Sequence, residues 1–246
     1  MGLISAVRAV FIRAHAQTST RPLFLEQYPS FSAFDGAALA ELLRRLPSRS
    51  RMLEIGSWLG QGSTKILIEA ARATDAEVFC VDTWQGNVNV ARHQEIATNY
   101  DILGTFRHNV DAAGGRPIVR MLVMPSESAA DVLADASFDF VFIDADHSYR
   151  STKADIHAWR SKVKPGGILC GHDCEGRVAD FDRERLVESL DGDTIPGNER
   201  FSQIHPGVIM AVDEEFDGRA DLFAERQIQA AEGMTGRSTI WYIVLP

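Results

Sequence analysis

The chain has 246 residues, with 25 lysines and arginines against 34 aspartates and glutamates, so its net charge is −9. Hydrophobic residues make up 45% of the chain and charged residues 24%, which is typical of a globular protein and excludes a disordered, collagen-like or coiled-coil chain. The acidic balance argues against a nucleic-acid partner, because it would repel phosphates, and it favours a small-molecule partner.

An N-terminal helical segment is predicted over residues 1–48. Its first part has apolar side chains at helical spacing: Leu3, Ile4, Val7, Val10 and Phe11. We expect this short amphipathic helix to pack on the domain or on a second copy of the chain, as in a homodimer. No run approaches the roughly 18 apolar residues of a membrane span, so stable membrane insertion is not expected.

From residue 51 onwards, predicted strands alternate with predicted helices. We expect strands over 51–56, 77–82, 118–123, 138–144, 168–171 and 240–245, and helices over 63–73, 126–133, 149–163 and 208–216. The repeated β-α-β order predicts an α/β fold with a doubly wound, mostly parallel sheet in a single domain over 1–246. Two long polar stretches, 85–115 and 175–206, interrupt the alternation and are predicted to be lid or substrate segments.

Cysteine usage indicates the compartment. The chain has three cysteines, too few for a disulfide framework. Cys80 and Cys170 lie in apolar runs, whereas Cys174 is expected nearer to solvent. This pattern predicts a cytoplasmic protein.

A glycine-rich turn follows the first predicted strand. Its residues of interest are Glu54, Gly56, Ser57, Gly60 and Ser63. The spacing matches neither the dinucleotide-binding nor the phosphate-binding loop. Asp82 closes the next strand, where a carboxylate suits the two hydroxyls of a ribose. We interpret the turn as a site for a nucleoside-type cofactor, with a purely structural turn as the alternative.

Two further runs close the fourth and fifth predicted strands: F-D-F-V-F-I-D-A-D-H-S-Y at 138–149 and K-P-G-G-I-L-C-G-H-D at 164–173. Together with the E-x-G-x-x-x-G motif at residues 54–60 and Asp82, these two runs resemble the class I methyltransferases that depend on S-adenosyl-L-methionine (SAM). The D-x-D-H-S-Y and G-H-D pair is similar to the metal-associated O-methyltransferases of small molecules, including those of macrolide sugars. Catechol-type enzymes share it more distantly. The resemblance implies a seven-stranded Rossmann-like methyltransferase sheet.

The resemblance also implies cofactor-binding and catalytic residues. Glu54 and Asp82 would face SAM, and Ser126 and Glu127 would lie where the family contacts adenine. His147 matches the position of the general base in the sugar enzymes.

Asp144 and Asp173 end strands that are adjacent in this fold, so their carboxylates are predicted to converge on one ion. Oxygen ligands favour Mg²⁺, while His172 beside them favours Mn²⁺, Fe²⁺ or Zn²⁺, of which Mn²⁺ is the second candidate ion. Asp144 is expected to contact the cofactor and the reacting groups as well. Two alternatives stay open: Asp146 replaces Asp144 as ligand, or His172 faces away, because consecutive strand residues alternate.

These observations predict a SAM-dependent O-methyltransferase for a small hydroxylated acceptor, with a sugar or glycoside favoured, divalent-metal assistance and a histidine general base. The alternatives are a catechol- or phenol-type O-methyltransferase and a non-catalytic SAM-binding protein. A metal hydrolase would leave the glycine-rich turn unexplained. Four further histidines have no predicted role: His93, His108, His157 and His205.

Overall fold

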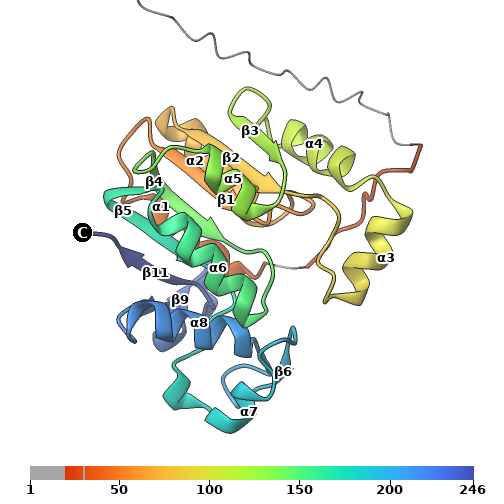
Figure 1. Cartoon of the computed structure of the whole chain (residues 1–246). Coiled ribbons are helices and arrows are strands. Elements are labelled where there is room, and N and C mark those ends of the chain that lie inside the picture. Colours follow the sequence, from red (N-terminus) through yellow and green to blue (C-terminus); the bar gives the residue numbers. More distant parts are fainter. Residues whose placement is uncertain (1–19, 30) are drawn as a thin grey trace, which may run out of the picture.

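The computed structural model describes residues 20–29 and 31–246. Its centre is a seven-stranded sheet in the order β3-β2-β1-β4-β5-β11-β8 (Figure 1). The strands are β1 (Arg51–Ile55), β2 (Glu77–Asp82), β3 (Val119–Val123), β4 (Phe138–Ile143), β5 (Val163–Gly171), β8 (Asp221–Leu222) and β11 (Trp241–Val244). The first five pair in parallel, and β11 runs antiparallel to β5 and β8. The predicted mostly parallel, Rossmann-like sheet is confirmed.

Helices cover both faces of the sheet (Figure 1). One face carries α1 (Ala33–Leu43), α2 (Ser63–Thr74), α3 (Ala91–Asn99) and α4 (Ile102–Ala112); the other carries α5 (Ser126–Val132), α6 (Tyr149–Arg160) and α8 (Pro206–Phe216). Phe140 and Val141, which are neighbours on β4, belong to the two different cores. The apolar run in β4 is therefore buried on both faces, as a central parallel strand requires.

Helix α6 ends at Arg160 rather than at residue 163, and β5 already begins at Val163 instead of 168. The strand therefore includes Pro165, which lies between the predicted helix and the predicted strand. Pro165 is exposed and lies beside a register shift in the β4–β5 pairing, so its missing N–H costs no ladder bond.

The two long polar stretches contain regular structure. The first holds α3 and α4, and Phe106 of α4 is fully buried. The second holds η1 (Val178–Asp180), α7 (Arg183–Val187) and the hairpin of β6 (Ile195–Pro196) with β7 (Gln203–Ile204). The later short elements are η2 (Phe223–Glu225), β9 (Ile228–Gln229), η3 (Ala231–Gly233) and β10 (Thr235–Gly236).

Helix α1 begins with a capping box. The hydroxyl of Ser32 accepts from the backbone N–H of Asp35, and the Asp35 carboxylate accepts from the backbone N–H of Ser32. The amphipathic helix predicted at residues 3–11 lies outside the described residues. Within the described part, no helix has the length and apolar character needed to cross a membrane. Cys174, expected near solvent, is only 1% exposed.

Candidate functional site

Two adjoining cavities open where the parallel strands end. The first, of about 260 Å³, is lined by Gly56, Asp82, Asn87, Ser126 and Asp144 among others. The second, of about 370 Å³, is lined by the rest of the glycine-rich turn and by a group of histidines and carboxylates. Ligands of open α/β sheets bind at this edge, so both cavities lie where the fold predicts a site.

The carboxylate of Asp82 is held in place at the first cavity. It accepts from the backbone N–H groups of Trp58 at 2.8 Å and Trp84 at 2.6 Å. Burial raises the pKa of Asp82, and these two N–H groups oppose that shift. Because Asp82 lines this cavity, its carboxylate can also accept from ribose hydroxyls.

The glycine-rich turn depends on the absence of a side chain at Gly56. A Cβ there would lie 1.9 Å from the carbonyl oxygen of Asp144, and the residue has φ +86°. The turn therefore packs directly on the backbone that follows β4. Of the other predicted turn residues, Ser57, Gly60 and Ser63 line the second cavity and not the first.

The structure does not bring two of the predicted cofactor residues to either cavity. Glu54 is fully buried, and its carboxylate accepts from the hydroxyls of Ser63 and Thr64, both at 2.6 Å. Burial raises its pKa, and the two hydroxyls oppose that shift. Glu54 thus fixes the start of α2 beneath the turn instead of facing a ligand. Glu127 is exposed on α5 and lines neither cavity.

Ser126 lines the first cavity, as the prediction for adenine requires. Its hydroxyl donates to the carboxyl group of Asp155 and accepts from Nε1 of Trp159 at 2.7 Å. Two residues of α6 therefore fix Ser126 from behind.

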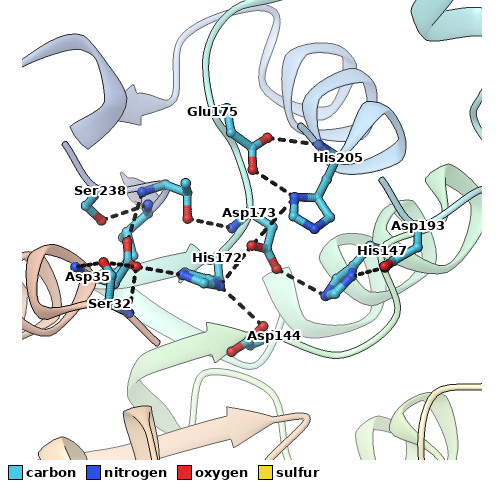
Figure 2. A network of polar contacts seen from close by, with 12 residues as sticks. Ser32, Asp35, Asp144, His147, His172, Asp173, Glu175, Asp193, His205 and Ser238 are labelled. Carbon is cyan, nitrogen blue, oxygen red and sulfur yellow. Dashed lines mark hydrogen bonds and ion pairs between the residues drawn. The ribbon is translucent and has the colours of Figure 1, made fainter. Parts of the chain in front are cut away.

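A cluster of histidines and carboxylates surrounds Asp173 at the second cavity (Figure 2). Nε2 of His147 lies 3.1 Å from one oxygen of Asp173, and Nδ1 of His172 lies 3.1 Å from the other. Asp144 lies 3.7 Å from the same nitrogen of His172. The structure thus brings together all four residues predicted for metal binding and catalysis.

His172 does not face away, although it directly precedes Asp173 in the chain. Strand β5 ends at Gly171, and Asp173 has φ +62°, in the left-handed region. This conformation breaks the side-to-side alternation of a strand, so both side chains reach the same cavity. The alternative in which Asp146 replaces Asp144 is not supported: Asp146 accepts from the backbone N–H of Ser148 at the start of α6.

Charge neighbours set the protonation of the cluster. Burial lowers the pKa of His147, but Asp173 outweighs it and holds that pKa well above its usual value. Burial also lowers the pKa of His172, but the carboxylates of Asp173 and Asp144 outweigh burial and hold that pKa well above its usual value. In return, His172, His205 and His147 hold the pKa of Asp173 well below its usual range, although burial opposes them. Buried charges of this kind are costly to place and gather at functional sites.

Sequence reasoning missed several residues of the site. His205 lines the second cavity, with Nδ1 2.7 Å from Glu175, and His93 stacks on Trp58 at 4.4 Å between ring centroids. Asp193 lies 2.6 Å from Nδ1 of His147. These residues come from the two polar stretches, which have no readable motif.

The first cavity suits a nucleoside-type cofactor. Besides the Asp82 carboxylate, this cavity has Nδ2 of Asn87 and Nε1 of Trp58, which are buried without a hydrogen-bond partner among the described residues. Both side chains line this cavity, so its wall still offers donors to a ligand.

The cluster suits a divalent cation. Two groups of three side chains offer ligand atoms within 4.8 Å of one another: Asp144, His172 and Asp173, and His147, Asp173 and His205. Mg²⁺ prefers an octahedral set of oxygens, which this mixture of imidazoles and carboxylates does not match well. Nitrogen and oxygen ligands together fit a first-row transition metal better.

Comparisons with known proteins agree with this fold. The family model described as "Methyltransferase domain" matches residues 53–174. Cofactor-bound Rv0187 from MTB is 20% identical, with 89% of this chain and 83% of that chain covered and a TM-score of 0.55. The O-methyltransferase NovP is 17% identical, with coverages of 87% and 78% and a TM-score of 0.53.

A curated relative, "uncharacterized protein y4gI" of Sinorhizobium fredii, is 30% identical over 135 residues. The match covers 53% of this chain and 14% of that protein, so the chain corresponds to a small part of this relative.

The sheet order, the glycine-rich turn and the cavity beside Asp82 define an α/β protein with a cavity at its strand ends that suits a nucleoside-type cofactor. The matching family model identifies residues 53–174 as a methyltransferase domain, and the fold around it is that of the class I SAM-dependent methyltransferases.

Proposed function

We propose that this protein is an O-methyltransferase that transfers the methyl group of SAM to a hydroxyl of a small acceptor, with a sugar or glycoside as the favoured class. The observation that supports it is a shared wall: Gly56, Trp58, His93, Asp144 and Ala145 line both cavities. A cofactor with its adenosine in the first cavity can therefore extend its methionine end into the second. The methyl group would then lie beside the histidine cluster.

The second cavity has the chemistry to bind a hydroxylated ring. Asp193 and Gln203 line it and can accept hydrogen bonds from acceptor hydroxyls. Tyr28 and Phe31 add aromatic surface on which the apolar face of a ring can pack. The same aromatic surface makes a phenol or catechol the second candidate acceptor. We infer that the stretches 85–115 and 175–206, which contribute His93, Asp193 and Gln203, determine the choice.

Methyl transfer requires an acceptor oxygen that gives up its proton, and we infer that His147 takes it. Because burial lowers the pKa of His147 less than Asp173 raises it, the ring can act as a base only after Nε2 has lost its own proton, and a cation bound at Asp173 would favour that loss by offsetting the carboxylate charge. Asp193 lies 2.6 Å from Nδ1, which orients the ring and stabilises the imidazolium. Nε2 lies on the Asp173 side of the second cavity. A divalent cation bound in the cluster would polarise the acceptor oxygen and ease loss of its proton.

The test is methyl transfer from isotopically labelled SAM to a panel of sugars, glycosides and catechols, with a divalent cation and again with EDTA. We expect label in a glycoside and its loss with EDTA. If only catechols become labelled, the acceptor is a catechol and not a sugar. If transfer persists in EDTA, the cation has no part in the reaction. SAM binding without transfer to any member would favour the non-catalytic alternative.

Two variants separate cofactor binding from proton transfer. His147→Asn should lower turnover by about 10²–10⁴-fold while the Kd for SAM is unchanged, as expected when a general base is removed. Asp82→Ala should weaken SAM binding by about tenfold or more, since a hydrogen bond to a charged group contributes about 1.5–3 kcal/mol. The matched controls are His157→Ala and Asp131→Ala, both at exposed helix positions. Full turnover in His147→Asn would contradict the base assignment.

A further inference from the structure

Each of the three imidazoles around Asp173 has one ring nitrogen against an outer carboxylate (Figure 2). Two pairs are hydrogen-bonded: His147–Asp193 at 2.6 Å and His205–Glu175 at 2.7 Å. The third, His172–Asp35 at 3.3 Å, is an ion-pair contact in which Nε2 of His172 makes no hydrogen bond to any described residue. Histidines that bind metals commonly donate their outer N–H to a carboxylate, as in the first two pairs, which fixes the ring and raises the basicity of the ligand nitrogen. The inner nitrogens of His147 and His172 both lie 3.1 Å from Asp173.

The charge of the cluster also favours a cation. Five carboxylates surround three imidazoles, so an excess of two negative charges remains even when every imidazole is protonated. The five are Asp35, Asp144, Asp173, Glu175 and Asp193. Three of them, Asp35, Asp173 and Glu175, are at most 9% exposed, so water does little to screen this excess.

We propose that the cluster binds a first-row transition-metal cation such as Mn²⁺, Fe²⁺ or Zn²⁺ in preference to Mg²⁺, with His172 as the nitrogen ligand that sets the preference and Asp35 as the positioning residue that holds His172. This deepens the proposed function, on which it rests, by naming the cation of the same site. Imidazole is a good ligand for these cations, whereas Mg²⁺ favours oxygen ligands and keeps several waters.

Asp35 is placed to hold His172 in one orientation. One of its carboxylate oxygens accepts from the backbone N–H of Thr239 at 3.0 Å, and the other lies 3.3 Å from Nε2 of His172. The ring of Phe31 lies 4.9 Å from the His172 ring, centroid to centroid. With Asp35 at Nε2, the nitrogen that remains for a cation is Nδ1, beside Asp144 and Asp173.

The experiment measures cation binding directly, on the full chain stripped of metal. Mn²⁺ is titrated with detection of free Mn²⁺ by electron paramagnetic resonance, Zn²⁺ is titrated against a chromogenic chelator, and Mg²⁺ is measured by displacement of Mn²⁺. We expect Mn²⁺ and Zn²⁺ to bind tighter than Mg²⁺, on the order of tenfold or more. The bound Mn²⁺ should show electron spin echo modulation from a directly coordinated ¹⁴N.

Variants then assign the preference to its residues. His172→Glu replaces the imidazole by a carboxylate, so the ¹⁴N modulation should weaken and the preference should shift towards Mg²⁺. Asp35→Asn should lower Mn²⁺ affinity by about 10–100-fold, the usual cost of losing an outer carboxylate behind a ligand histidine. Because Asp35 also caps α1, His172→Glu keeps the test valid if Asp35→Asn does not fold. Asp191→Asn, at an exposed position two residues from Asp193, is the control.

Equal or tighter binding of Mg²⁺, absence of ¹⁴N modulation, or failure of every cation to bind would each overturn the inference. These readouts do not depend on methyl transfer. Cation binding as expected without transfer to any acceptor would contradict the proposed function and leave the inference standing. Methyl transfer by a protein that binds no cation would contradict the inference and leave the proposed function standing.

Discussion

Asp155 supports the wall of the cofactor cavity from inside the protein, and its replacement should stabilise the fold. It is 5% exposed, and its carboxyl group accepts from the hydroxyl of Ser126, which also accepts from Trp159. Burial raises the pKa of Asp155 from 3.8 to about 7, with Ser126 opposing the shift and the charges of Glu127 and Asp146 adding to it.

A pKa that is raised in the folded protein means that folding is favoured by the protonated carboxyl group. The corresponding stability is fully present below pH 3.8 and is lost as the pH rises through about 7. At 1.36 kcal/mol per pH unit, the loss reaches about 4 kcal/mol at pH 8. Asp155→Asn retains the shape and an oxygen that accepts from Ser126, but it buries no charge. The variant should therefore exceed the wild type in stability by up to this amount.

The assay is urea unfolding followed by circular dichroism between pH 5 and pH 8.5. The difference in free energy of unfolding between Asp155→Asn and the wild type should grow by about 2.5 kcal/mol across this range. Asp131→Asn, at an exposed position on α5, should show no such trend. A difference that does not change with pH, or a variant less stable than the wild type at pH 8, would refute the reasoning.

Three further substitutions probe the frame of the site. Gly56→Ala should abolish SAM binding and lower the Tm, because its Cβ would lie 1.9 Å from the carbonyl oxygen of Asp144; unchanged binding by calorimetry would contradict this packing. Phe106→Ala should cost about 3–5 kcal/mol in urea unfolding, since this buried ring anchors α4. Arg226→Ala should cost at most about 1 kcal/mol, because its ion pair with Glu41 is partly exposed.

The arrangement of the strands was predictable because local pattern and sheet position agree. The run from Phe138 to Ile143 is apolar on both faces, and β4 pairs with both β1 and β5 in the middle of the sheet. Parallel strands place their carboxyl ends at one edge, so Asp82, Asp144 and Asp173 could be expected there. The exact start of β5 was not predictable, because Pro165 and its glycines fit a helix stop and an irregular strand equally well.

The partners of the site residues were not predictable, because they are distant in sequence. Asp35 contacts the backbone at Thr239, 204 residues away, and its capping box predicts only where α1 begins. Glu175 and His205 meet across 30 residues that contain α7 and the β6–β7 hairpin, and neither lies in a periodic pattern. The direction of His172 depended on the left-handed conformation of Asp173, which no spacing rule reveals.

The sheet itself aligns the cofactor cavity with the cluster. Backbone hydrogen bonds continue one step beyond the strand ends: Gly56 N–H to Val81 at 2.9 Å, Asp144 N–H to Ile55 at 2.8 Å and His172 N–H to Ile143 at 3.0 Å. Each bond joins the first residue after one strand to the last residues of the neighbouring strand. The functional groups therefore lie along this edge in the order of their strands, β2-β1-β4-β5. Asp82 of β2, the turn at Gly56, Asp144 and His172 follow one another across this edge. Because the ladder fixes this order, a cofactor that binds Asp82 and crosses Gly56 points its far end at the cluster.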